Sequence, residues 1–455
     1  MFPFCYEDLK SMRIIGLFLI VASLLAPLYW YVPLADRYPF GAVFSQYLGS
    51  AALIAMGIVQ LFATRARWLE PLFGGLDRIY VQHKWLGIIA MVAVLLHDTI
   101  DAEINNIGRE TALIDLAETL GEISLYSLLI LVVITITTFI PYHLWKWTHK
   151  LMGGFFALSA FHYLFILKPF DNIDPLGLYV LSFCVVGIFC YIYTLLPERS
   201  VRLKHAYSVS NLERTAGSLS VELAPIGKGF RHKAGQFAFI SFDSDGLNEV
   251  HPYTISKRST EDRSLRFTIK PLGDHTHQLQ KSLQPGMTAK VQGPFGHFRR
   301  PTGNAPQIWI AAGVGITPFL AWAQELSETT SPQETHLFYC VRNEAEAAHL
   351  EELKSLAEGK SGFTLHLWQS EQEGRLDAEK ILARTQTDPT MSYVAFSGPE
   401  AMRKALKDAF SSRGVSSKRF LYEEFEIRSD IGLWKLVAWL YHSLRSETQM
   451  RLAAR

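Results

Sequence analysis

The chain has 455 residues, with 44 Lys and Arg against 43 Asp and Glu, so its formal net charge is +1. This near-neutral balance, without a basic run, argues against a nucleic-acid partner, and the length allows about three domains. The four cysteines, Cys5, Cys184, Cys190 and Cys340, are scattered without a C-x-x-C pair, which argues against structural disulfides and a zinc site.

Charged residues are unevenly distributed along the chain: only 25 of the 87 Asp, Glu, Lys and Arg lie in residues 1–197. Long apolar runs follow one another in this part, close to the ~20 residues that cross a hydrocarbon core. We therefore predict a membrane bundle of six transmembrane helices, the first retained rather than cleaved as a signal peptide. The expected spans are residues 13–34, 41–63, 83–100, 122–140, 149–167 and 176–196.

Lys and Arg in the connections predict the orientation, because cytoplasmic loops are enriched in them. With the N-terminus inside, eleven Lys and Arg fall on the inner side and three on the outer side. Six spans then return everything after residue 197 to the cytoplasm, as in a multi-pass protein of a bacterial inner or plasma membrane. The acidic outer loop at residues 98–121 slightly favours a cationic acceptor.

Two predicted spans carry histidines at similar spacing: His83 and His97 in the third, and His149 and His162 in the fifth. A titratable side chain inside a membrane helix is a functional candidate, with hydrogen-bonded packing as the competing interpretation. The rises of ~21 Å and ~20 Å match in depth. We expect His83 to face His149 and His97 to face His162 as axial ligands of two haems. Thirteen ideal residues do not return the second pair to one face, which suggests an irregularity at residues 153–154.

After residue 200 the pattern changes to short alternating strands separated by Gly, Pro and Asp, which is typical of an antiparallel β-barrel. From residue 306, strands alternate with apolar-periodic helices, which predicts a doubly wound α/β domain. The expected strands are residues 236–242, 265–270, 307–312, 335–341, 364–368 and 393–397, with helices ending near Ser327 and beginning near Glu344 and Glu400.

A glycine-rich turn, Gly313-Val314-Gly315-Ile316-Thr317-Pro318, follows the strand at residues 307–312. Its glycines let the backbone approach a pyrophosphate, and Pro318 suits a first helical turn, although such a turn alone is equally typical of a structural bend. The barrel adds His251-Pro252-Tyr253-Thr254-Ile255-Ser256. Further segments follow in order: Gly273-Asp274-His275-Thr276, Gly293-Pro294-Phe295-Gly296, Tyr339-Cys340-Val341-Arg342, Ser397-Gly398-Pro399 and Tyr422-Glu423-Glu424-Phe425.

In this order, the segments resemble those of the ferric reductase and NADPH oxidase superfamily, within the ferredoxin reductase-like class, over nearly the whole chain. The resemblance implies FAD, two haems b, and NADPH or NADH. It implies Tyr253 against the isoalloxazine, Thr254 near its reactive N5, and Phe425 covering the flavin until nicotinamide displaces it. Core packing is the alternative for Tyr253 and Phe425. Ser397 stands where the family usually has a cysteine near the site of hydride transfer.

The resemblance also implies the remaining contacts with the flavin and the dinucleotide. The flavin contacts are His251, Pro252, Ser256, Lys270, Gly273 and Thr276, and the dinucleotide contacts are Gly313, Gly315, Thr317, Pro318, Arg342, Gly398 and Pro399. His83, His97, His149 and His162 are the implied haem ligands.

The implied domains are a haem-binding membrane domain at 1–197, an FAD-binding β-barrel at 198–305, a NAD(P)-binding α/β domain at 306–428 and a helical extension at 429–455. Electrons then pass from cytoplasmic NAD(P)H through FAD and the haems to dioxygen, a ferric or other metal ion, or a protein or quinone. Two alternatives stay open: a membrane-tethered flavin reductase serving a protein or quinone, and a non-catalytic haem-binding sensor. The sequence does not distinguish NADPH from NADH.

Overall fold

The computed structural model describes residues 14–100, 104, 107, 111–136, 142–215, 217–329 and 333–423. The described chain divides into two compact units that meet in sequence between Leu196 and Pro197. Phe425 and the predicted extension at 429–455 lie outside the described residues, as does much of the acidic loop.

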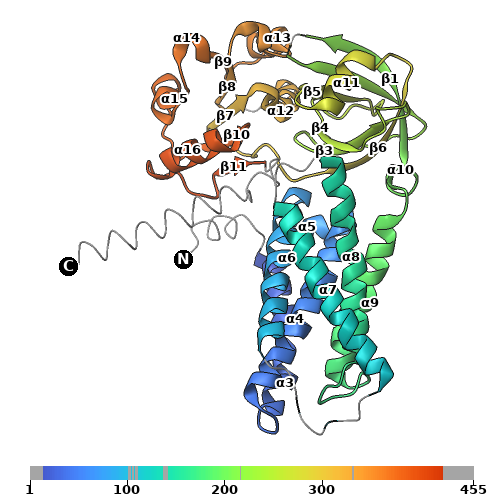
Figure 1. Ribbon diagram of the computed structural model, residues 1–455. Coiled ribbons are helices and arrows are strands. Elements are labelled where there is room, and N and C mark those ends of the chain that lie inside the picture. Colours follow the sequence, from blue (N-terminus) through green and yellow to red (C-terminus); the bar gives the residue numbers. More distant parts are fainter. Residues whose placement is uncertain are drawn as a thin grey trace, which may run out of the picture. The chain divides into compact units, whose positions relative to one another are not determined.

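The described residues of the first unit form helices and connecting turns without a strand, and Figure 1 shows the long helices running side by side. Pro27 lies two residues after the end of the first helix and precedes a second short helix, which completes the first predicted span. The helices are α2 (Ile14–Leu25), α3 (Leu28–Leu34), α4 (Phe40–Ala63), α5 (Glu70–Phe73), α6 (Leu76–Thr99), α7 (Ala112–Ile136), α8 (Tyr142–Phe165) and α9 (Pro175–Leu195).

Among the described residues, five segments are long and apolar enough to cross a membrane: α2 with α3, α4, α6, α7 and α9. The predicted count of six spans is not confirmed. A helix is present where the fifth span was expected, because α8 has 24 residues, but it is not among these five. Lys146 and Lys150, with His143 and His149, make the first half of α8 polar.

Glycines allow close packing at two helix contacts in this unit. A Cβ on Gly57 of α4 would lie 2.6 Å from the carbonyl oxygen of Phe183 on α9, and a Cβ on Gly153 of α8 would lie 2.1 Å from the Tyr191 ring. The chain remains α-helical from residue 142 to 165, so the expected irregularity near Gly153 is not found. Gly153 instead makes room for an aromatic ring of the neighbouring helix.

The second unit begins with a six-stranded antiparallel sheet in the order β4-β3-β6-β1-β2-β5. A bridge between Ile255 and Phe267 joins the chain after β4 to β5, so the sheet nearly closes into the predicted barrel. Pro252 lies on the edge strand β4, where its missing N–H is tolerated. The elements are α10 (Glu198–Val201), β1 (His205–Arg214), β2 (Leu219–Ile226), β3 (Phe237–Phe242), β4 (His251–Thr254), β5 (Leu265–Ile269), α11 (Asp274–Ser282) and β6 (Thr288–Phe295).

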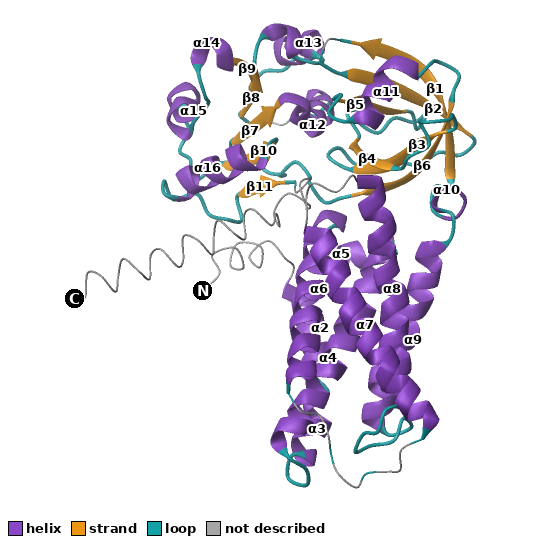
Figure 2. Ribbon diagram, viewed as in Figure 1, coloured by secondary structure: helices purple, strands orange, loops and turns teal. Residues whose placement is uncertain are grey.

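The rest of this unit is a parallel sheet in the order β11-β10-β7-β8-β9 with helices around it (Figure 2). Strands β7, β8 and β10 have the predicted bounds. The helix expected from Glu344 begins later, because Glu344–Glu346 forms only a 3-10 turn and His349 adopts a φ of +59° before α13. The elements are β7 (Gln307–Ala312), α12 (Thr317–Ser327), β8 (Thr335–Val341), α13 (Leu350–Glu358), β9 (Phe363–Gln369), α14 (Ser370–Glu373), α15 (Ala378–Thr385), β10 (Tyr393–Ser397), α16 (Glu400–Ser411) and β11 (Phe420–Tyr422).

Candidate functional site

The four predicted ligand histidines share one hydrogen-bonding state. Nδ1 of His83 lies 3.2 Å from the Val59 carbonyl, Nδ1 of His97 lies 2.9 Å from the Ser45 carbonyl, and Nδ1 of His162 lies 2.9 Å from the Ala117 carbonyl. A carbonyl oxygen can only accept, so Nδ1 carries the proton and Nε2 presents its lone pair in each ring.

His149 reaches the same state through a hydroxyl group. Its Nδ1 lies 3.4 Å from Thr135 Oγ1. Thr135 Oγ1 already donates its one proton to the Leu131 carbonyl at 2.8 Å, so it accepts from His149. None of the four Nε2 atoms has a hydrogen-bond partner within the described part of the chain.

The inner histidines face one another across the bundle. The ring centres of His83 on α6 and His149 on α8 are 6.1 Å apart, with the planes tilted by 49°. A metal held between two imidazole nitrogens by bonds of about 2 Å each would separate the ring centres by roughly 6 Å. Trp145 stacks on the His149 ring at 5.1 Å. The spacing therefore fits a pair of axial ligands.

The outer histidines each lie against a glycine of a supporting helix. A Cβ on Gly49 of α4 would lie 3.3 Å from the His97 ring, and a Cβ on Gly121 of α7 would lie 2.6 Å from His162 Nδ1. Gly49 follows Ser45 by four residues, and Gly121 follows Ala117 by four, so carbonyl and glycine share one face of each helix. This acceptor-x-x-x-Gly spacing was readable in the sequence, but its meaning required knowing which helices are neighbours.

These histidines fit haem ligation by their donor chemistry. Metal-bound histidines commonly donate their other ring N–H to a carbonyl or another acceptor, which fixes the tautomer and raises ligand basicity. α4 supplies the acceptors for both histidines of α6, and α7 supplies those for both histidines of α8. The described residues thus include four imidazoles whose tautomer is already fixed for metal binding. The ring centres of two of them, His83 and His149, have the separation that one metal requires.

The predicted flavin strand lies at the edge of the barrel. Tyr253 is partly buried against the barrel core, Thr254 is buried, and the buried Tyr253 hydroxyl has no hydrogen-bond partner among the described residues. Burial raises the pKa of that phenol, so it remains protonated. An unpaired buried hydroxyl on an aromatic ring fits a flat ligand with polar edge atoms, as FAD has.

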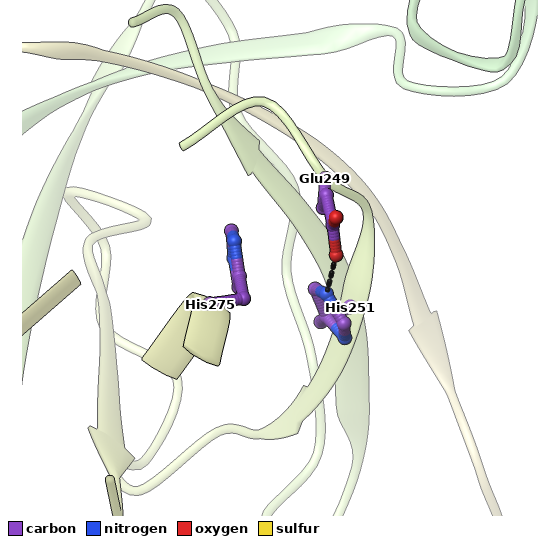
Figure 3. A group of neighbouring side chains, drawn as sticks. All are labelled: Glu249, His251 and His275. Carbon is purple, nitrogen blue, oxygen red and sulfur yellow. Dashed lines mark hydrogen bonds and ion pairs between the residues drawn. The ribbon is translucent and has the colours of Figure 1, made fainter. Parts of the chain in front are cut away.

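Three side chains gather beside this strand, as Figure 3 shows: Glu249, His251 and His275. His251 Nε2 lies 2.9 Å from Glu249 Oε2, and the rings of His251 and His275 stack with their centres 4.4 Å apart and an interplanar angle of 24°. Ligand lone pairs lie in the ring plane, so two near-parallel rings do not aim at one point, and this arrangement is not a formed metal centre.

The start of α11 completes the candidate flavin site. Thr276 Oγ1 accepts from the backbone N–H groups of Leu272 and Gly273, which fixes the turn that opens the helix. His275 Nδ1 is buried without a hydrogen-bond partner in the described chain, and burial, with a smaller effect of His251, lowers the pKa of His275. Helix N–H groups and imidazole N–H groups suit phosphate oxygens, so these residues fit the FAD phosphates.

The glycine turn lies at the carboxyl end of β7. Gly313 has a φ of +56°, and a Cβ on Gly315 would lie 2.1 Å from the carbonyl oxygen of Ser397, so neither position accommodates a side chain without strain. Lys270 reaches this turn from the barrel: its Nζ would lie 4.0 Å from a Cβ on Gly313, and both residues line one cavity. Thr317 donates to the Val314 carbonyl, and Pro318 lies in the first turn of α12.

A buried polar network joins the barrel to the α/β lobe. Arg266 of β5 makes two hydrogen bonds to the Glu352 carboxylate of α13, at 2.9 and 3.1 Å. Burial works against ionisation of Glu352, but the hydrogen bonds and charge of Arg266 lower its pKa overall. His349 Nε2 lies 2.9 Å from Thr268 Oγ1, which donates to Ser256. The network holds the two lobes together, and the sequence offered no signal for it.

The structure therefore brings together Gly313, Gly315, Lys270, Ser397 and Gly398 at one sheet edge, and His251, Tyr253 and His275 at one barrel edge. Ser256 lies in the network between the lobes rather than at a surface. Pro399 precedes α16. Arg342 follows β8 and is 67% exposed. Phe425 is outside the described residues, so its flavin-covering role stays a prediction.

Family models match three parts of the chain, of which the last two overlap at residues 309–337. Residues 48–160 match "Ferric reductase like transmembrane component", residues 204–337 match "FAD-binding domain", and residues 309–408 match "Oxidoreductase NAD-binding domain".

Two curated relatives illustrate the range of similar proteins. The reductase component of propane 2-monooxygenase from Rhodococcus jostii is 24% identical over 50% of this chain and 64% of its own length. Dual oxidase 1 from Caenorhabditis elegans is 26% identical over 44% of this chain and 13% of its own length. The chain thus spans less than two thirds of each of these relatives.

Among solved structures, the FAD/NAD-binding domain of nitric oxide dioxygenase from Vibrio cholerae is similar with a TM-score of 0.44 and 21% identity, over 49% of this chain and 98% of that one. The three family matches and the five apolar spans agree with one another. The chain is an integral membrane oxidoreductase with a ferric reductase-like transmembrane component followed by FAD-binding and NAD-binding domains.

Proposed function

We propose that the chain carries electrons from a cytoplasmic nicotinamide dinucleotide through FAD and two bis-histidine haems to an acceptor on the opposite side of the membrane. The observation that carries this proposal is the common state of His83, His97, His149 and His162, each with Nδ1 donated and Nε2 presented. Packing alone gives no reason for four intramembrane imidazoles to leave the same nitrogen unpaired.

The proposal requires α8 to cross the membrane as a sixth span. α8 is as long as α4 and α6, and it packs against α7 and α9, which are both apolar spans. Its lysines lie in its first half, toward the side that the loop charges assign to the cytoplasm. With α8 as a span, the N-terminus and the flavin and nucleotide domains share the cytoplasmic side, and the pairing of His97 with His162 lies toward the outside.

When bound, FAD would supply the chemistry that divides the hydride of a nicotinamide into the single electrons that haem iron can accept. The chain binds and orients these groups. Tyr253 and Thr254 hold the isoalloxazine, while His251, His275 and the start of α11 hold the phosphates. The glycine turn at Gly313 holds the dinucleotide, and the Arg266–Glu352 pair keeps the two lobes in register so that the nicotinamide reaches the flavin.

The names of similar proteins support onward electron delivery. One is the reductase component of a monooxygenase and another is a dual oxidase. We therefore place the acceptor outside the reductase domains and propose three classes: dioxygen, ferric or other metal ions, and a quinone or protein. The expected acidic outer loop favours a metal cation slightly.

Vectorial transfer is tested with the full chain in sealed vesicles. NADH or NADPH is supplied to the side that carries the nucleotide domain, and superoxide, Fe(II) and reduced quinone are measured on the opposite side. The proposal predicts one reduced product on the far side that disappears in the His97→Leu variant. Reduction confined to the side of the nucleotide, unchanged by His97→Leu, would instead establish a tethered flavin reductase.

A further inference from the structure

Charged residues at the carboxyl ends of the parallel strands affect whether the chain prefers NADH or NADPH. In doubly wound sheets, the dinucleotide lies across the carboxyl ends of the strands, with its pyrophosphate at the glycine turn. The group that reads the ribose 2′ position follows the strand next to that turn: a carboxylate accepts from a 2′-hydroxyl, or an arginine accommodates a 2′-phosphate. Here that strand is β8, and Arg342 and Asn343 follow it.

Arg342 already forms an ion pair with a carboxylate of this chain. Its Nε lies 3.1 Å from Glu346 Oε1, and Glu346 lines the cavity that also contains Gly313 and Val314. A carboxylate therefore stands on the ligand side of the arginine, next to the turn that receives the pyrophosphate. The negative charge of Glu346 offsets the attraction that Arg342 would exert on a phosphate.

The neighbouring segment adds more negative charge. The Glu371 backbone N–H donates to the Arg342 carbonyl at 3.2 Å, which fixes the residues after β9 to the end of β8. The Glu371 carboxylate lies 3.3 and 3.4 Å from Asn343 Nδ2. Glu371 thus stands beside the residue that follows Arg342.

Two other cations close to these segments, Lys354 and Arg384, are engaged with carboxylates. Lys354 lies 2.9 Å from Glu351 and 3.4 Å from Glu344, and Arg384 pairs with Glu373. The two segments at the strand ends, residues 342–346 and 370–373, contain four glutamates and one arginine. A 2′-phosphate, which carries about −1.5 to −2 charge at pH 7, would be repelled there, whereas a 2′-hydroxyl would donate to a carboxylate.

We infer that this chain uses NADH in preference to NADPH, and that Glu346 and Glu371 determine that choice. This inference rests on the proposed function, because it names the dinucleotide that the proposed electron path begins with. Glu346 acts by holding Arg342 away from a phosphate, and Glu371 acts by placing a second negative charge at the same strand end.

The test compares the two dinucleotides on the purified full chain, with flavin reduction followed by absorbance. We expect kcat/KM for NADH to exceed that for NADPH at least about tenfold, with the difference mainly in KM, because the 2′ position is remote from the reacting atoms. In the Glu346→Gln/Glu371→Gln variant, kcat/KM for NADPH should rise about tenfold or more. Glu379→Gln is the matched control, since it removes the same charge from an 82% exposed side chain on α15 that pairs with Arg413.

Ligand binding provides a second readout that does not depend on turnover. 5′-AMP and 2′,5′-ADP differ by the 2′-phosphate, and their protection of the chain against thermal unfolding can be compared directly. The wild type should be protected more by 5′-AMP, and the double variant should gain protection by 2′,5′-ADP. Equal or better use of NADPH by the wild type would overturn the inference alone. Failure of both dinucleotides to reduce the flavin would overturn the proposed function together with it.

Discussion

Gly121 and His162 are in direct contact: a methyl group at Gly121 would come within 2.6 Å of His162 Nδ1, the atom that donates to the Ala117 carbonyl. Only a residue without a side chain lets the ring lie this close to α7. The contact links the identity of residue 121 to the orientation of a proposed haem ligand.

Gly121→Ala should therefore displace the His162 ring and lower the haem content of the purified chain toward one haem, with FAD content unchanged. Gly87→Ala is the matched control, because a Cβ on Gly87 of α6 would have no atom within 4 Å. Haem is counted by absorbance after extraction. Equal haem content in the two variants would show that Gly121 is not needed for haem binding.

Replacing one outer ligand should remove one haem only. His162→Leu leaves the His83–His149 pair, with its ring centres 6.1 Å apart, intact. We expect half the wild-type haem content and an unchanged rate of flavin reduction by NADH, measured by stopped-flow absorbance. Full haem content in this variant would exclude His162 as a ligand.

Thr135 should tune the inner haem. Its hydroxyl accepts from His149 Nδ1, and this hydrogen bond makes the imidazole a stronger donor to iron. Thr135→Val removes a hydrogen bond worth about 1 kcal/mol, so the midpoint potential of one haem should rise by a few tens of mV. Thr119→Val on the same helix is the control, because Thr119 bonds only to the Asp115 carbonyl. Identical redox titrations of the two variants would contradict this role.

Gly315→Ala should abolish dinucleotide use without loss of FAD. A Cβ there would lie 2.1 Å from the Ser397 carbonyl oxygen, so either the turn or β10 must move. We expect flavin reduction by NADH to slow at least about 100-fold, while bound FAD and its chemical reduction by dithionite stay normal. Loss of FAD from the variant would show that the turn supports the barrel rather than the dinucleotide.

His349 should make the second unit sensitive to acid. Its pKa is lowered from 6.5 to about 4, mainly by burial and secondly by the nearby Arg266, against the opposing effect of Glu352. The folded value lies below the unfolded one, so the unfolded chain binds more protons between about pH 4 and 6.5. The stabilisation is complete above pH 6.5 and is lost as pH falls toward 4.

The free energy of unfolding of this unit should thus fall by about 1–2 kcal/mol from pH 7 to pH 5 through His349 alone. His349→Gln keeps a hydrogen-bonding side chain beside Thr268 but cannot titrate, so the fall should be smaller by that amount. Unfolding followed by flavin fluorescence at both pH values measures it. The same pH dependence in wild type and variant would assign the acid sensitivity to other groups.

Much of this architecture follows from local sequence pattern. Strand bounds such as Gln307–Ala312 and Tyr393–Ser397 were predictable because parallel strands buried on both faces are continuous apolar runs between turn residues. The break before α13 was not, since it depends on the φ of +59° at His349, a residue held by Thr268 of another lobe. Tertiary contact overrides the helical pattern of residues 344–349 there.

The candidate haem site was also predictable only in part. The spacing of His83, His97, His149 and His162 predicted two pairs, and the inner pair does face across the bundle. The function of Gly153 was not predictable, because its neighbour Tyr191 lies on another helix. The supporting carbonyls likewise belong to α4 and α7, so only the packing of helices reveals that each Nδ1 has an acceptor.

Electrons from the nicotinamide should reach haem held by these four histidines. The most direct test adds NADH without air to the purified full chain and records the visible spectrum. We expect two b-type haems per chain, both of which become reduced, and a single haem in the His97→Leu variant. Haems that stay oxidised while the flavin is reduced, or a chain without haem, would contradict it.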